Sequence, residues 1–182
     1  MKRKTAKELL DESFRELSEK KSIDKITIQE ITDNCGYSPA TFYRNFRDKY
    51  DLIAWGYTRD VAGIMDWLDG KNYQWKQTLL DGANHFLEER DYLANLLKHT
   101  SGQESFIRYM VEINYEALKK YILKASGKNR LDKKDELYVR IYCLGTVSLT
   151  CEWILGRHEA SPEEIAEIYE HSLPAPLQKY VL

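Results

Sequence analysis

The chain of 182 residues contains few of the residues that interrupt or cross-link a fold: 9 glycines, 4 prolines and 3 cysteines. Cys35, Cys143 and Cys151 are odd in number and lack C-x-x-C spacing, which argues against a disulfide framework and a zinc site. We therefore expect reduced, buried thiols and no metal. No apolar run approaches the roughly 20 residues that cross a bilayer, and no signal peptide is evident. We expect a cytoplasmic protein without a membrane partner.

Strand-like alternation of apolar and polar residues is also missing, whereas apolar residues recur at helical spacing throughout. This pattern predicts an all-α fold. The chain shows no convergent acid/base pair, no glycine-rich phosphate loop and no nucleophile with local support. We therefore expect no enzyme and no cofactor, and an all-helical enzyme is only a remote alternative.

Residues 27–36 predict a short helix with clear ends. Thr27 and Glu30 form a capping box, in which the hydroxyl and the carboxylate each accept a backbone N–H, so the helix should begin near residue 28. A stripe suited to burial then recurs at i, i+3, i+4 and i+7: Ile28, Ile31, Thr32 and Cys35. Gly36 follows at the position where a left-handed residue ends a helix.

A second short helix follows at once. Ser38 can cap it, Pro39 suits its first position, and Phe42 and Phe46 lie four apart on one face as core anchors. The opposite face carries small residues and then hydrogen-bonding residues, as a helix that enters a groove requires: Pro39, Ala40, Thr41, Tyr43, Arg44 and Asn45. Asp48 can cap the next helix. Lys49 lies at the start of that helix, where the dipole disfavours a cation, and a phosphate contact would explain it.

A helix-turn-helix outline also occurs as a purely structural helical hairpin, so the spacing by itself leaves both interpretations open. Upstream, apolar residues at helical spacing between Ala6 and Leu17 predict a first helix that covers the next two. The three helices would form a small head. Residues 1–50 carry 11 Lys and Arg against 9 Asp and Glu, and the other 132 residues carry 16 against 20. The early basic residues are either an arm that touches phosphate or an ordinary solvated terminus: Lys2, Arg3, Lys4 and Lys7.

The rest of the chain predicts further helices, most of them separated by glycine- or proline-containing breaks, at about residues 49–69, 75–89, 92–97, 106–125, 132–155 and 162–173. The helix from about 132 to 155 is apolar over much of its circumference. It should therefore be buried on more than one side, and in so small a body a contact between subunits is the better explanation. Gly145 and Ser148 would let a partner helix approach.

The segment ITIQEITDNCGYSPATFYRNFRDKYDL resembles the signature of TetR-family regulators. The positions that match are Thr27, Ile31, Gly36, Ser38, Thr41, Tyr43, Phe46, Lys49 and Leu52. Cys35 replaces the usual alanine and Tyr37 the usual valine, at turn positions that affect packing more than DNA contact. The pattern CEWILGRHEASPEEIAEIY resembles the body of regulators of the dihydroxyacetone kinase operon type, a weaker resemblance.

The resemblance implies a helix-turn-helix DNA-binding domain over residues 1–48 and a larger helical effector-binding and dimerisation domain over residues 49–182. It also implies a homodimer formed by the last two helices, about 132–156 and 161–173. Such a dimer places its recognition helices in successive major grooves, about 34–36 Å apart, so the operator should be palindromic. Phosphate contacts would come from Thr27, Ser38, Tyr43, Asn45 and Lys49. Base-edge contacts would come from Pro39, Ala40, Thr41 and Arg44, with Arg44 suited to guanine.

In the family, a small molecule bound in the body releases the DNA, so we expect a ligand-responsive repressor. The candidate pocket residues are mostly aromatic: Trp67, Trp75, His85, Phe86, His99, Phe106, Tyr109, Met110, Tyr142 and Trp153. Stripes of this kind also pack ordinary helical cores, so each residue has a purely structural alternative. The alternative function is a TetR-like activator whose body binds a protein co-regulator instead of a metabolite.

Overall fold

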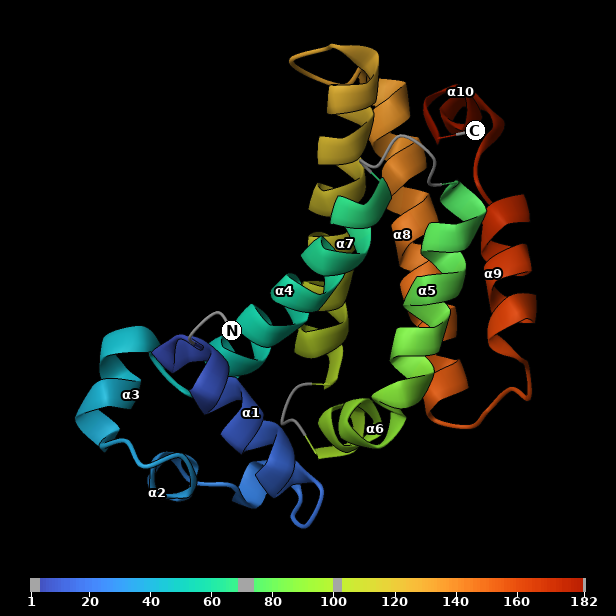
Figure 1. Cartoon of the computed structure of the whole chain (residues 1–182). Coiled ribbons are helices and arrows are strands. Elements are labelled where there is room, and N and C mark those ends of the chain that lie inside the picture. The colour runs from blue at the N-terminus through green and yellow to red at the C-terminus, as the bar shows by residue number, and fades with distance from the viewer. Residues whose placement is uncertain (1–3, 69–73, 100–102, 182) are drawn as a thin grey trace.

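The computed structural model describes residues 4–68, 74–99 and 103–181, apart from the side chains of residues 67–68 and 103–105. All regular structure in these ranges is helical, which confirms the all-α prediction, and it forms a small head and a larger body (Figure 1). The elements are α1 (Ala6–Ser18), η1 (Ile23–Lys25), α2 (Ile28–Asn34), α3 (Pro39–Asn45), α4 (Lys49–Leu68), α5 (Trp75–Glu88), α6 (Arg90–His99), α7 (Gln103–Ser126), α8 (Lys133–Ile154), α9 (Pro162–His171) and α10 (Ala175–Val181). No helix in the described ranges is long and apolar enough to span a membrane.

Local capping determines where several helices start and stop. Capping boxes at Thr27 and Ser161 begin α2 and α9 as predicted, and Gly36 ends the α2 turn with a φ of 73°. The sequence analysis missed two short elements, η1 and α10. Pro174 lies in a break between helices, as predicted, but a further helix follows it: its carbonyl accepts from the N–H of Leu177 (2.8 Å) and α10 begins at the next residue. Leu177 is fully buried and anchors that helix.

Helices α1, α2 and α3 form the head around side chains that are completely buried, among them Leu10, Phe14, Ile31 and Phe42. The hydroxyl of Ser13 donates to the carbonyl of Ile31 (2.7 Å) and joins α1 to α2 inside this core. The head is therefore held by its own apolar core as well as by its attachment to the body.

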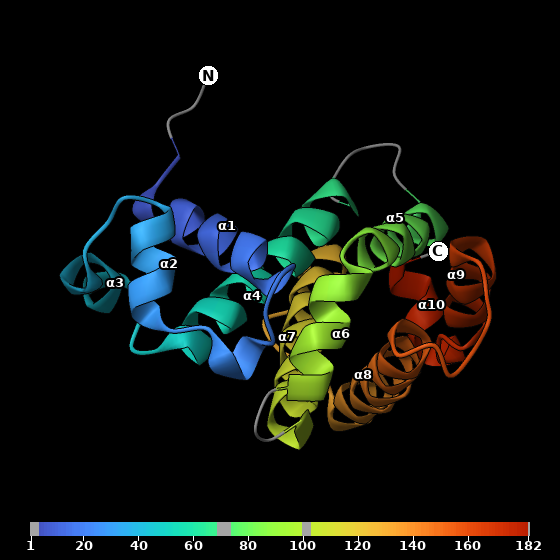
Figure 2. The same cartoon turned by 90° about the horizontal axis from the view of Figure 1, so that it is seen from below.

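In the body, α4 leads away from the head, α7 packs against α8, and α5 packs against α9 (Figure 1). Helix α10 packs against α7 and α8. Helix α6 lies between the head and the rest of the body, and it contacts α1 and η1 on one side and α7 and α8 on the other (Figure 2). Motion in the body can therefore reach the head through α4 and through α6.

The guanidinium of Arg15 is the ionic link between the head and the body. Its Nε donates to Asp11 in α1 (3.1 Å), its Nη2 to Asp60 in α4 (2.7 Å) and its Nη1 to Glu89 before α6 (2.6 Å). The same group lies over the ring of Tyr92 in α6, 4.6 Å from its centroid. One side chain thus connects three elements that are far apart in sequence.

A second, uncharged link lies next to the first, at the C-terminal end of α1. The side-chain amide of Asn95 in α6 donates to the carbonyls of Ser18 (2.8 Å) and Lys21 (3.0 Å). Its carbonyl oxygen accepts from the N–H of Ile23 (3.2 Å). Asn95 therefore fixes the connection between α1 and α2 to the body without using a charge.

Close packing at Gly56 makes the ionic link testable. A Cβ atom added there would lie 2.5 Å from Oδ1 of Asp11, which is fully buried and held through Oδ2 by Arg15 and Arg59. Turning the Asp11 carboxylate away would break those ion pairs. Gly56→Ala should therefore lower the free energy of unfolding by about 1–3 kcal/mol in urea denaturation.

Gly63→Ala is the matched control, because it lies in the same helix and its added Cβ meets no atom within 4 Å. It should raise the free energy of unfolding by up to about 1 kcal/mol through helix propensity. Equal effects of the two substitutions would show that Asp11 is not held rigidly against α4.

Candidate nucleic-acid interface and body cavity

Helix α3 is positioned with one face in the head and the other in solvent. The hydroxyl of Ser38 accepts from the N–H of Thr41 (3.3 Å) and begins the helix, with Pro39 in its first turn. Phe42 is fully buried and Phe46 nearly so, and their rings lie 5.7 Å apart. Because these two side chains fix the inner face, the residues between them point outward.

Hydrogen-bonding groups cover the outer face of α3. Tyr43 is 60% exposed, and Ala40 and Arg44 are also exposed. Arg44 donates through Nη2 to the hydroxyl of Thr41 (2.9 Å), and Asn45 donates to the carbonyl of Thr41 (2.8 Å). Most guanidinium N–H groups of Arg44 remain available for other acceptors. The surface thus offers a phenol, a guanidinium and an amide in a row.

Lys49 has an intramolecular role that the sequence analysis did not foresee. Its ammonium group donates to the backbone carbonyls of Ile23 (2.9 Å), Asp24 (2.9 Å) and Ile26 (3.0 Å). These bonds account for all three ammonium protons. They also explain why a cation stands at the start of α4, since it joins that helix to the η1 segment.

Thr27 and the basic N-terminal residues are the other candidates for DNA contact, and the structure describes only part of this set. Thr27 is exposed, and its hydroxyl donates to Oε2 of Glu30 (2.9 Å) within the capping box. In the predicted basic arm, residues 2 and 3 lie outside the described residues. Lys4 pairs with Glu12 (2.7 Å), and the Lys7 ammonium lies 5.1 Å from the centroid of the Phe46 ring.

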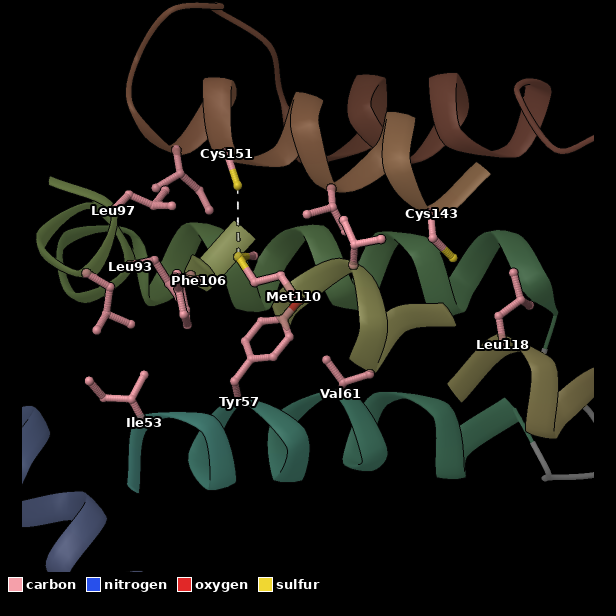
Figure 3. Close-up of a cluster of buried hydrophobic side chains, with 14 of the residues drawn as sticks. Ile53, Tyr57, Val61, Leu93, Leu97, Phe106, Met110, Leu118, Cys143 and Cys151 are labelled. Carbon is pink, nitrogen blue, oxygen red and sulfur yellow. Dashed lines mark hydrogen bonds between the residues drawn. The ribbon is translucent and has the colours of Figure 1, made fainter. Parts of the chain in front are cut away.

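A cavity of about 100 Å³ lies inside the body between α4, α5, α7, α8 and α9. Tyr57 and Val61 on α4, Met110 and Leu118 on α7 and Cys143 on α8 point into this region (Figure 3). Its lining residues are Tyr57, Val61, Ile64, Met65, Trp75, Thr78, Leu79, Gly82, Ala83, Phe86, Met110, Asn114, Ala117, Leu118, Tyr142, Cys143, Thr146, Val147, Thr150 and Tyr169. This lining is mainly apolar, as is usual for sites that bind small molecules.

The polar groups of the cavity wall are neutral and largely bonded to one another. The Tyr142 hydroxyl donates to the carbonyl of Tyr169 (3.0 Å), and the hydroxyls of Tyr169 and Thr150 lie 2.6 Å apart. Burial raises the pKa of Tyr142, and the nearby indole N–H of Trp75 opposes that rise. This N–H is buried and makes no hydrogen bond of ordinary geometry. Burial raises the pKa of Cys143 to about 12, so its thiol stays protonated.

The structure brings four of the predicted pocket residues to the cavity wall: Trp75, Phe86, Met110 and Tyr142. Five others lie elsewhere in the fold. Phe106 packs on the ring of Tyr57, and the hydroxyl of Tyr109 bonds to Thr58 and Ala54. The indole of Trp153 donates to the carbonyl of Ala160. His85 lies 3.6 Å from Asp60, and His99 is exposed at the end of α6. The side chain of Trp67 lies outside the described residues.

Sequence reasoning missed the polar members of the wall, above all Asn114, Thr146 and Thr150. The sequence does mark these residues, because each lies on the apolar stripe of its helix. Asn114, for example, follows Met110 by four residues and precedes Ala117 by three. A polar residue on a buried stripe must find a partner, so it indicates either a structural hydrogen bond or a site.

Comparisons with known proteins agree with this arrangement. Residues 9–54 match the family described as bacterial regulatory proteins of the tetR family, and residues 73–174, more than half of the chain, match a transcriptional regulator C-terminal region. An uncharacterized HTH-type transcriptional regulator of Haemophilus influenzae is 37% identical over 51 residues. That alignment covers 28% of this chain and about a quarter (25%) of the relative.

Three solved structures share the fold at low identity. The dihydroxyacetone kinase operon activator DhaS has a TM-score of 0.65 at 16% identity, with 96% of this chain and 95% of that one covered. The TetR family repressor AlkX of Dietzia sp. has 0.60 at 18%, with both chains fully covered at 100%. FadR of Thermus thermophilus has a TM-score of 0.60 at 17% identity, with 92% of this chain and 91% of that one covered. These structures share the fold, and the two family matches over residues 9–54 and 73–174 show that the chain belongs to the TetR family of transcriptional regulators.

Proposed function

We propose that this regulator is a dimeric repressor that leaves a palindromic operator when a small molecule occupies the body cavity. The observation that carries the proposal is the continuity of α4, which starts beside the recognition helix and lines the cavity further along. The proposed domain boundary lies at residues 48 and 49, where α4 begins. A ligand that shifts α4 would change the orientation of the head.

Within the head, we assign two kinds of DNA contact. Thr27, Ser38 and Tyr43 are exposed and Asn45 is partly exposed, and their polar groups are suited to phosphates, which position a protein on the duplex. Pro39, Ala40 and Thr41 are small enough to let α3 approach base edges, and Arg44 can make a bidentate contact with guanine. Lys49 would reach a phosphate only by giving up one of its carbonyl contacts.

The exposed apolar face of α8 supports a dimer. Leu137 is 62% exposed, Ile141 66% and Leu144 48%, at helical spacing on one face. A Cβ atom at Gly145 would meet no atom within 4 Å, so a partner helix has room there. Helix α9 packs chiefly on α5 and adds only Ile168 as an exposed large apolar residue. Helix α8 is thus the main proposed contact.

The alternative is an activator whose body binds a protein, and the likeness to DhaS, an operon activator, is the observation that favours it. FadR of Thermus thermophilus was solved with lauroyl-CoA, a charged molecule far larger than this cavity, so its ligand is not transferred to this chain. Titration of small molecules into the operator complex separates the two functions. Loss of DNA favours a ligand-responsive repressor, whereas indifference to metabolites combined with dependence on a protein favours the activator.

The DNA-reading face can be tested at Arg44. Sites selected from a random duplex library should be palindromic, and Arg44→Ala should weaken the preference for the selected site over random duplex by about 1–3 kcal/mol, because a bidentate base contact is lost. The measurement is competition binding at fixed salt. Arg157 is an exposed arginine in the body, three residues after the end of α8, and Arg157→Ala should leave the preference unchanged. An unchanged preference in Arg44→Ala would refute its assignment to a base.

Lys49 distinguishes an internal role from a phosphate contact. Lys49→Met removes three hydrogen bonds from a cation and takes this donor from the carbonyls of Asp24 and Ile26, whereas that of Ile23 keeps the N–H of Ile26. The free energy of unfolding should therefore fall by about 1–3 kcal/mol. Urea denaturation checks this, with Lys25→Met, an exposed neighbour, as the control. If stability stays the same and only the salt dependence of DNA binding decreases, Lys49 acts on phosphate alone.

The dimer face can be tested at Ile141. Ile141→Glu would bury a carboxylate between subunits, so it should shift the dimer towards monomer in sedimentation at micromolar concentration. Palindrome binding should weaken in parallel. Leu87→Glu on α5, where the leucine is 41% exposed, is the matched control and should stay dimeric. A dimeric Ile141→Glu variant would move the interface away from this face.

A further inference from the structure

The cavity wall contains no charged side chain among its twenty lining residues. Lysine, arginine, histidine, aspartate and glutamate are all missing from that set. Moving a carboxylate, phosphate or ammonium group from water into such a site costs several kcal/mol unless a counter-charge or several hydrogen bonds compensate it. The site therefore disfavours ionic ligands.

Tyr57 on α4 and Asn114 on α7 are a pair of neutral groups on facing helices that offer directional hydrogen bonds. The other unpartnered donor of the wall, the buried indole N–H of Trp75, lies near the Tyr142 hydroxyl. The side-chain nitrogen of Asn114 lies 2.9 Å from the carbonyl oxygen of Met110. Because that carbonyl can only accept, the amide must present its NH2 group there. The same nitrogen lies 2.7 Å from the hydroxyl of Tyr57, so the phenol oxygen is the acceptor of the second N–H.

This arrangement leaves two groups without a partner. The phenolic proton of Tyr57 is not donated to any other residue in the described chain, although the side chain is only 5% exposed. The amide oxygen of Asn114 likewise accepts no hydrogen bond there. Burial raises the pKa of Tyr57 above its usual value, so the proton remains on the phenol. One donor and one acceptor thus stand side by side in an apolar wall.

Size narrows the ligand further. The cavity holds about 100 Å³. Sites for drug-sized molecules usually reach about 300–1,000 Å³, whereas an engineered apolar cavity of roughly 150 Å³ binds benzene. The cavity is smaller than both, so a molecule with one ring, or an alkyl group of similar size, is the upper limit.

We propose that the cavity binds small, uncharged, single-ring or short alkyl molecules that carry a carbonyl or hydroxyl oxygen, and that Tyr57, oriented by Asn114, donates to that oxygen. This inference rests on the proposed function, because it names the chemical class of the effector of that same site. Tyr57 determines the preference among neutral ligands, and the missing counter-charge excludes acids.

The test compares three probes of nearly equal shape on the full-length protein: acetophenone, α-methylstyrene and benzoate. In α-methylstyrene a CH2 group replaces the carbonyl oxygen, and benzoate adds a charge. Calorimetric titration, supported by thermal melting, should show acetophenone binding about tenfold more tightly than α-methylstyrene, as one added hydrogen bond allows. Benzoate should show no binding at the same concentrations.

Tyr57→Phe removes only the donor and should reduce the tenfold preference to about one. Tyr109→Phe is the matched control, since its hydroxyl bonds to Thr58 and Ala54 away from the cavity, and it should keep the preference. Equal binding of the two neutral probes by the wild type, binding of benzoate, or no binding of any probe would each overturn the proposal. The wild-type ranking stands as a test even if a variant folds poorly.

Release of the operator DNA is measured in a separate experiment. It distinguishes a failure of the proposed effector role from a failure of the proposed ligand class. If acetophenone binds with the expected ranking but leaves the DNA complex intact, the effector role fails and the ligand class stands. If charged ligands release the operator and the neutral ranking is absent, the ligand class fails and the proposed function stands.

Discussion

The position of the head depends on the charges gathered around Arg15. This one guanidinium bonds to carboxylates from α1, α4 and the start of α6, and Arg59 adds a second cation at Asp11 (3.0 Å). Burial raises the pKa of Asp11 although both arginines oppose it, whereas Asp60, in spite of burial, has its pKa lowered by His85 and Arg15. Asp11 is therefore the member whose burial costs most. If Arg15 or Arg59 were removed, the buried carboxylate of Asp11 would lose part of the positive charge that offsets its burial.

This network makes α1 and α4 move together. Asp60 and Gly56 lie one turn apart on α4, and both contact the Asp11–Arg15 pair. Asn95 holds the C-terminal end of α1, close to Arg15, through neutral bonds to backbone atoms, which salt screens far less than exposed ion pairs. Two attachments of different chemistry hold α1, so the head should rotate as a unit when α4 or α6 shifts.

The parts that sequence predicts best are the ones set by neighbouring residues. The Thr27 capping box, the Ser38-Pro39 start and the Gly36 turn need only a few consecutive positions, and together they located the recognition helix. The partners of Arg15 lie 45 and 74 residues away, and Lys49 bonds to carbonyls, which carry no side-chain signal. The aromatic stripes predicted which residues are apolar, but not which of them face a cavity rather than a neighbouring helix.

The proposed ligand contact and the contacts between α4 and the head lie within one turn of α4. Tyr57 follows Gly56 directly and precedes Asp60 by three residues, so the residue that lines the cavity lies in the same turn of α4 as the contacts with Asp11 and Arg15. A helix is stiff over this length, because its backbone hydrogen bonds repeat every turn. Any displacement that a ligand imposes on Tyr57 must therefore be absorbed either by Asp11, which has no space beside Gly56, or by movement of α1. Because the first is sterically closed, we expect the head to be the part that moves if a ligand displaces Tyr57.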